Sequence, residues 1–143
     1  MISGSILIID QLTKFIIAAT FVPSESHPVL PPILHLTYVQ NTGAAFGMLK
    51  GQQLIFIILS LVVIGWVGRE LILHPRRSRI MQWGCALLLG GAAGNLIDRL
   101  RLGYVIDFLD FRIWPVFNVG DSAITIGVVL LMWHSMNNAS DSA

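Results

Sequence analysis

Charged side chains are scarce in this 143-residue chain: only 12% of its residues are Asp, Glu, Lys or Arg, against about 25% in a typical soluble domain. Hydrophobic residues make up 55% of the chain, and the mean hydropathy is +0.74. The net charge of +1 provides no basic surface of the kind that binds nucleic acid, so we expect no nucleic-acid partner. The composition instead predicts a single membrane domain over residues 1–143, in contact with lipid along most of its length.

Cysteine is nearly absent, with Cys85 alone inside an apolar run. A single cysteine excludes an internal disulfide and a cysteine-based zinc cluster. We expect its side chain to be a small buried hydrophobic group. His27 and His35 have no partner at a metal-ligand spacing, so both are interpreted as loop or interface residues rather than metal ligands.

Long apolar runs are abundant, and four of them predict membrane-spanning helices of the roughly 20 residues that cross a bilayer. Their approximate ranges are 2–22, 52–73, 80–98 and 118–136. No basic residue precedes Lys14, so the first run lacks the pattern of a cleaved signal peptide and is expected to remain as a helix. In the third run small residues lead into Asn95 and Asp98 on one stripe, which predicts close helix contacts on that face.

The connections between these runs predict the topology. A group of prolines ends the first run and places residues 23–51 outside the bilayer core, with a short strand at 33–39 and a turn of small residues at 41–47. These prolines are Pro23, Pro28, Pro31 and Pro32. Arginines gather in and around the loop 74–79, which marks it as cytoplasmic; they are Arg69, Arg76, Arg77 and Arg79. Both termini are then cytoplasmic, and segments 23–51 and 99–117 are extracytoplasmic.

Aromatic residues recur at intervals of three within 104–117, a pattern typical of an aromatic belt or of an amphipathic segment in the membrane interface. They are Phe108, Phe111, Trp114 and Phe117. The predicted fold is therefore an all-α membrane protein: four transmembrane helices with a small extracytoplasmic β-segment and a short periplasmic interfacial helix or loop.

The few acidic residues are concentrated where apolar runs end. Residues 90–121 contain four of the eight, namely Asp98, Asp107, Asp110 and Asp121. Carboxyl groups at membrane depth are costly unless they are paired, hydrated or protonated, so these are functional candidates. Asp10 and Lys14 lie four residues apart on one helical face, and we expect this neutralised pair to fasten the first helix to its neighbours.

No serine–histidine pair, metal-ligand spacing or phosphate-binding glycine loop occurs at a suggestive place in the sequence. The remaining chemistry is that of two close carboxyl groups, which share one proton and titrate together. One can take a proton from water while the other polarises a carbonyl, as in aspartic proteases. A polar stripe at the start of the fourth run places this site near the extracytoplasmic face: Asn118, Asp121, Ser122 and Thr125. Spacing alone does not identify which two acids pair.

Five short motifs resemble, in order, those of the lipoprotein signal peptidases (bacterial signal peptidase II), a family of four-helix inner-membrane aspartyl proteases. The motifs are DQLTK at 10–14, NTGAAF at 41–46, GGAAGNLIDR at 90–99, VIDF at 105–108 and FNVGD at 117–121. Each motif alone is weak, but the set runs from the first span to the fourth and is highly specific.

The resemblance implies that Asp107 and Asp121 are the catalytic pair. It also implies a group of residues that support the site or contact substrate: Asp10, Lys14, Asn41, Gly43, Asn95, Asp98, Arg99 and Asn118. The implied substrate is a prolipoprotein whose cysteine already carries diacylglycerol, cut just before that cysteine. No metal or other cofactor is implied, and we expect a monomer in the bacterial cytoplasmic (inner) membrane.

Two other classes of function are compatible with buried acids. A proton- or ion-conducting protein would spread polar groups through the membrane depth, whereas here, apart from Asp10 and Lys14, they gather at one end. An assembly subunit would use its acids only to pair with arginines, for example Asp98 with Arg99 or Arg101. The chain also departs from the family pattern in its short segment before Asp10, in its compact 107–121 linker, and in a glycine rather than alanine at position 120.

Overall fold

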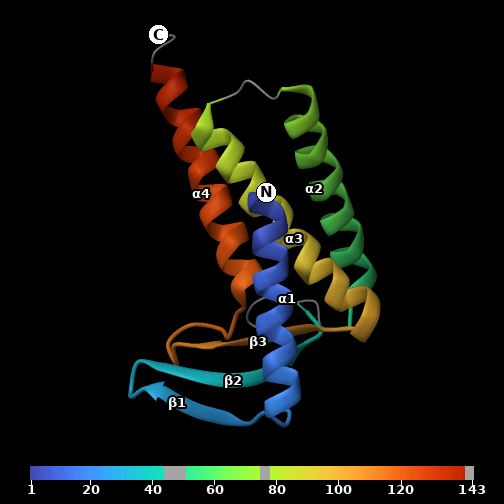
Figure 1. Ribbon diagram of the computed structural model, residues 1–143, viewed down its shortest axis with the longest axis vertical. Helices are drawn as coiled ribbons and strands as arrows, with labels where there is room; N and C mark the ends of the chain where they lie inside the picture. The colour runs from blue at the N-terminus through green and yellow to red at the C-terminus, as the bar shows by residue number, and fades with distance from the viewer. Residues whose placement is uncertain (44–50, 75–77, 141–143) are drawn as a thin grey trace.

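The computed structural model describes residues 1–43, 51–74 and 78–140. Four helices dominate it: α1 Ile2–Thr20, α2 Gln53–Leu73, α3 Arg79–Leu102 and α4 Val119–Ser140. Each contains a run long and apolar enough to cross a membrane, which confirms the four predicted spans. Lipid selects helices because a helix satisfies its backbone hydrogen bonds internally. The helices form one bundle, and a small sheet lies across one end of it (Figure 1).

The helix ends differ from the predicted ranges by a few residues. α3 continues past the predicted end at 98 to Leu102 and stops at Gly103, whose φ of 85° is left-handed backbone that glycine adopts without steric cost. Arg99 therefore belongs to the last turn of α3. The expected turn at 41–47 and the expected arginine cluster lie partly outside the described residues, which omit 44–50 and 75–77.

α3 is the central helix, and it packs against the other three. Its small residues allow this, as the stripe predicted. A side chain at Gly91 would collide with the backbone of Gly120 at the start of α4, and one at Gly94 would collide with the Asp10 carboxylate of α1. The glycines thus bring α1 and α4 close enough to α3 for their polar groups to meet.

The sheet has three antiparallel strands in the order β1-β2-β3: β1 Ser26–Leu30, β2 Leu34–Asn41 and β3 Val105–Asp110. Only β2 corresponds to the predicted strand at 33–39. β1 falls in the proline-rich segment, for which no strand was predicted, and Pro28 is tolerated there because β1 is an edge strand. In the register of β2 with β3, Val39 pairs with Asp107 and Asn41 with Val105, so the end of β2 lies beside Asp107.

Residues 104–117 differ from the expected interfacial segment. The first part is strand β3, and only residues 111–118 form an irregular loop. Of the four aromatic residues, Phe108 is not a belt residue, because its side chain is buried with Ile17 of α1 and Tyr38 of β2. Trp114 is 61% exposed, as a belt residue would be. A spacing of three does not distinguish a helix from a strand followed by a loop.

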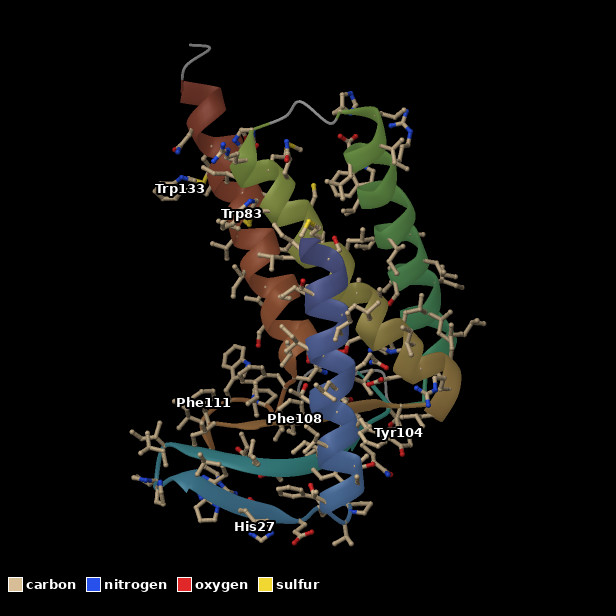
Figure 2. The ribbon with its side chains drawn as sticks, viewed as in Figure 1. His27, Trp83, Tyr104, Phe108, Phe111 and Trp133 are labelled. Carbon is tan, nitrogen blue, oxygen red and sulfur yellow. The ribbon has the colours of Figure 1, made fainter. Side chains whose placement is uncertain are left out.

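Exposed aromatic side chains occur toward both ends of the bundle. Figure 2 shows Trp83 and Trp133 at the end away from the sheet, and Tyr104 and Phe111 at the sheet end. Trp83 and Trp133 are more than half exposed. Tryptophan and tyrosine prefer the two boundaries between lipid and water, so this arrangement agrees with a bundle that crosses the membrane.

Candidate active site

The first turn of α4 carries Asp121 in a reciprocal capping arrangement with Asn118. The Asn118 Oδ1 atom accepts a hydrogen bond from the Asp121 backbone N–H at 2.8 Å, and the Asp121 Oδ2 atom accepts one from the Asn118 N–H at 3.3 Å. This is the logic of a capping box, in which the residue before the helix and the third helical residue satisfy each other's free donors. The capping geometry fixes where the Asp121 carboxylate points.

Asn118 also contacts the second carboxylate of the site. Its Nδ2 atom donates to Asp107 Oδ1 at 2.6 Å, and Asn41 Nδ2 from the end of β2 donates to Asp107 Oδ2 at 2.9 Å. Burial, together with the charge of nearby Asp121, raises the pKa of Asp107 from 3.8 to about 7. Asn118 therefore contacts both carboxylates, that of Asp107 through its side-chain amide and that of Asp121 through its backbone N–H, and the two charges interact.

Asn95 of α3 connects this pair to the interior of the bundle. It donates through Nδ2 to Asp121 Oδ1 at 2.7 Å, and its Oδ1 accepts from Lys14 Nζ at 2.8 Å and from Asn118 Nδ2 at 3.1 Å. Because Lys14 supplies only donors, it fixes the orientation of the Asn95 amide, which must then present its NH₂ group to Asp121.

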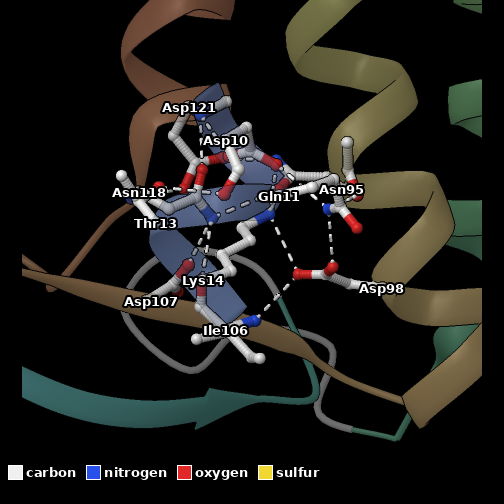
Figure 3. Close-up of polar contacts among 12 residues, drawn as sticks. Asp10, Gln11, Thr13, Lys14, Asn95, Asp98, Ile106, Asp107, Asn118 and Asp121 are labelled. Carbon is white, nitrogen blue, oxygen red and sulfur yellow. Dashed lines mark hydrogen bonds and ion pairs between the residues drawn. The ribbon is translucent and has the colours of Figure 1, made fainter. Parts of the chain in front are cut away.

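Lys14 is itself held by two carboxylates. Its Nζ atom lies 2.9 Å from Asp10 Oδ2 and 2.9 Å from Asp98 Oδ2, and all three side chains are buried. Asp10 also accepts from the Gly120 N–H at 2.7 Å, and Asp98 accepts from the Ile106 N–H at 3.1 Å. Figure 3 shows how these contacts join α1, α3, α4 and β3 around the carboxylate pair. The expected Asp10–Lys14 pair is confirmed as a buried tie between helices.

A cavity of about 730 Å³ opens onto both Asp107 and Asp121. Its lining is largely apolar, with Asn41, Gly43 and Arg99 among the exceptions. The Arg99 guanidinium lies 5.0 Å from the centroid of the Phe56 ring of α2, a stacking geometry that favours a cation. The cavity thus offers an apolar volume with two carboxylates and a cation at its wall.

Comparisons with known proteins agree on one family. The family model described as signal peptidase (SPase) II matches residues 2–137. The chain belongs to the signal peptidase II family. A lipoprotein signal peptidase of Moorella thermoacetica is 50% identical over 95% of this chain and 91% of its own length. That of Pelotomaculum thermopropionicum is 43% identical over 100% of this chain and 94% of its own. A solved bacterial membrane enzyme is 36% identical, with a TM-score of 0.93 over 99% of this chain and 89% of its own.

All ten residues that the sequence singled out gather at the sheet end of the bundle. An inner layer consists of the Asp10 carboxylate, the Asp98 carboxylate and the Lys14 ammonium. An outer layer consists of the residues that line the cavity. Asp98 contacts Lys14, whereas the assembly interpretation gave Arg99 or Arg101 as examples of its partner. Within the described residues, no group of three or more His, Cys, Asp or Glu side chains is placed to hold a metal ion.

Sequence reasoning missed some polar residues of this region. Gln11 donates to Asp98 Oδ1 at 3.0 Å and to the Gly94 carbonyl at 3.2 Å, so it belongs to the inner layer. Its position next to Asp10, inside an otherwise apolar run, could have indicated a buried polar role. Gln53, which donates to the Arg99 carbonyl at the end of α3, gave no such signal because it lies at a helix start, where polar residues are common.

Proposed function

We propose that the chain is an intramembrane aspartyl endopeptidase that removes signal peptides from diacylglyceryl-modified prolipoproteins, just before the lipidated cysteine. The observation that carries this proposal is the Asp107–Asn118–Asp121 arrangement: two carboxylates from different elements, each hydrogen-bonded by Asn118 and facing one apolar cavity. Such pairs hold a single proton between them.

The chemistry follows from that shared proton. The ionised carboxylate takes a proton from a water molecule as the water oxygen attacks the scissile carbonyl carbon. The protonated carboxyl donates its proton to the carbonyl oxygen. The tetrahedral diol then collapses and the C–N bond breaks. The proton gained from water passes to the leaving amine, and one diol hydroxyl returns a proton to the carboxylate that had donated its own. In this scheme Asn41, Asn95 and Asn118 hold the carboxyl oxygens in place, and no metal or cofactor takes part.

The cavity supports a lipid-modified substrate. Its walls carry side chains such as Ile113, Trp114 and Ile126, which are more than half exposed beside the carboxylate pair. An apolar surface of this kind suits the acyl chains of a diacylglyceryl group, which gain about 0.8 kcal/mol for each buried CH₂. The Arg99 guanidinium at the wall is placed to bind carbonyl or ester oxygens of the substrate, and Gly43 lets the substrate backbone approach.

The orientation in the membrane is part of the proposal. The polar network and the sheet lie at one end of the bundle, while Arg69 and Arg79 lie near the other ends of α2 and α3 (Figure 1). By the positive-inside tendency, we place both termini and the loop 74–79 in the cytoplasm. The active site then lies near the extracytoplasmic face of the bacterial inner membrane, where lipid-modified precursors arrive.

The test is cleavage of a purified diacylglyceryl-modified prolipoprotein in detergent, with the unmodified precursor run in parallel. We expect only the lipidated precursor to be cut just before its cysteine. Asp107→Asn and Asp121→Asn should each abolish cleavage while thermal unfolding shows a folded protein. Glu25→Gln, at an acid far from the network, should cleave normally. Cleavage by either folded dyad variant at the wild-type rate would refute the catalytic assignment.

A further inference from the structure

Arg112 has a backbone conformation that calls for an explanation. Its φ is 65°, in the left-handed region that residues other than glycine rarely adopt. The N–H of Ile113 donates to the Phe111 carbonyl at 2.8 Å, two residues back, so Arg112 is the central residue of a γ-turn. A γ-turn with positive φ is rare and strained, and strained residues of this kind persist only where their surroundings hold them in place.

The surroundings that hold Arg112 are polar groups from all three strands. Its N–H donates to Asp110 Oδ1 at 2.8 Å, its Nη1 lies 3.6 Å from Asp110 Oδ2, and its Nη2 donates to Ser26 Oγ at 2.8 Å. Ser26 Oγ is bonded to Thr37 Oγ1 at 2.8 Å, and Thr37 Oγ1 donates to Asp110 Oδ2 at 2.7 Å. We call these four residues, Ser26, Thr37, Asp110 and Arg112, the sheet clamp.

The charge of the sheet clamp is consistent with an ion pair at neutral pH. Burial acts to raise the pKa of Asp110, but hydrogen bonds from Thr37 and from the Arg112 N–H, with the Arg112 charge, outweigh it and leave the pKa below its ordinary value. Asp110 is therefore ionised at neutral pH and carries the charge opposite to that of the Arg112 guanidinium. None of the proposed catalytic steps uses either residue.

The loop that begins at this turn forms one wall of the cavity. Every residue of 111–117 except Arg112 lines it. The base of the loop is closed by Phe117, which exchanges backbone hydrogen bonds with Leu109 at 2.8 and 3.1 Å and stacks on Phe111 with 5.8 Å between ring centroids. Arg112 points to the sheet instead, while Ile113 is 93% exposed. The clamp thus fixes the start of the loop, and the contacts of Phe117 fix its end.

We propose that Asp110 and Arg112 are positioning residues for substrate binding: the sheet clamp holds the 111–117 loop as a wall against which the apolar part of the substrate packs. This inference rests on the proposed function, which supplies the substrate. Asp107 and Asp121 are anchored separately by Asn41, Asn95 and Asn118. Loss of the clamp should therefore weaken binding and leave the chemical step nearly intact.

The test measures kcat and KM for a diacylglyceryl-modified prolipoprotein with the purified full chain in detergent. Removing binding energy that is the same in the ground state and the transition state raises KM alone, so we expect Arg112→Ala to raise KM about fivefold or more with kcat within about twofold of wild type. Asp110→Asn should act in the same direction. Arg112→Lys, which keeps the charge and can reach Ser26 and Asp110, should recover most of the affinity, and Arg101→Ala at an exposed arginine should change neither constant.

Two further variants separate the clamp from a general loss of structure. Arg112→Gly accepts the positive φ without strain but has no side chain to bind the sheet, so its KM should also rise; a wild-type KM would overturn the proposal. In Asp110→Asn/Arg112→Ala the KM should resemble that of the worse single variant, because residues of one network are not additive. Effects that multiply would overturn the clamp. If Arg112→Ala does not fold, Arg112→Gly and Ser26→Ala provide the same comparison.

The outcomes also separate this inference from the proposed function. A wild-type protein that cuts no lipidated precursor would overturn the proposed function and this inference with it. An active wild type with unchanged KM in the Arg112 variants would overturn only the inference. So would a fall in kcat at constant KM, because it would place the clamp's effect on the carboxylate pair rather than on binding.

Discussion

The pH dependence of cleavage tests the proton that the proposed pair must share. Burial and the charge of Asp121 raise the pKa of Asp107 to about 7. A carboxyl whose pKa is raised keeps its proton through the acidic range and loses it as the pH rises through that value. Because one carboxyl must be protonated to polarise the carbonyl, kcat/KM should fall above about pH 7, by up to roughly tenfold for each further pH unit.

Asn41 provides a perturbation whose sign can be worked out from the structure. Its 2.9 Å hydrogen bond to Asp107 stabilises the ionised form and so lowers the pKa of that carboxyl. In Asn41→Ala the pKa should rise further, and the alkaline fall in kcat/KM should move to higher pH. A hydrogen bond to a charged group contributes about 1.5–3 kcal/mol, and each 1.36 kcal/mol corresponds to about one pH unit. With water replacing part of the lost bond, we expect a displacement of about one pH unit.

The assay is the initial rate of cleavage at lipidated substrate concentrations far below KM, followed from about pH 5 to about pH 9. Gln40→Ala is the matched control, since Gln40 is the neighbouring amide on β2 and bonds to the Tyr104 hydroxyl instead. Its profile should match that of wild type. A flat wild-type profile, or an alkaline fall that moves to lower pH in Asn41→Ala, would refute the electrostatic reasoning.

Two stability predictions follow from the packing. Gly91→Ala places a methyl group against the backbone at the start of α4 and should lower the free energy of unfolding by about 1–3 kcal/mol, as measured by thermal unfolding in detergent. Gly68→Ala is the control, because nothing lies within 4 Å of the added methyl group, and it should be neutral or stabilising. Equal unfolding temperatures for the two variants would contradict the close contact at Gly91. Lys14→Met leaves Asp10 and Asp98 buried without their cation and should cost about 3–5 kcal/mol. Unfolding at the wild-type temperature would show that these carboxyls do not carry charge.

The four spans were predictable because lipid imposes one solution on an apolar run of sufficient length. The stripe of small residues on α3 also predicted the face on which this helix makes close contacts. The strands were harder to predict: β3 is buried on both faces for most of its length, so it lacks the alternation that identifies a half-buried strand. Proline is unfavourable inside a sheet, and Pro28 is accommodated in β1 because this strand lies at the sheet edge.

The candidate site was predictable as a set of residues but not as an arrangement. The resemblance gave Asp107 and Asp121, and each lies beside an apolar segment. That Asn118 bridges them depends on how β3 returns to the start of α4, a long-range property that no local pattern contains. The contacts of Arg112 could not be predicted for a similar reason. Its partners Ser26 and Asp110 lie on β1 and β3, and neither strand was predicted.

The balance of buried charge supports the proposed shared proton at one end of this bundle. Asp10 and Asp98 each lie 2.9 Å from Lys14, so one ammonium already stabilises two carboxylates. Asp107 instead receives neutral amide hydrogen bonds from Asn41 and Asn118, which favour its ionised form less than a contacting cation would. The proton is therefore held most easily at the pair that faces the cavity. A second lysine beside Asp107 would remove that proton, and with it the acid that the proposed reaction needs.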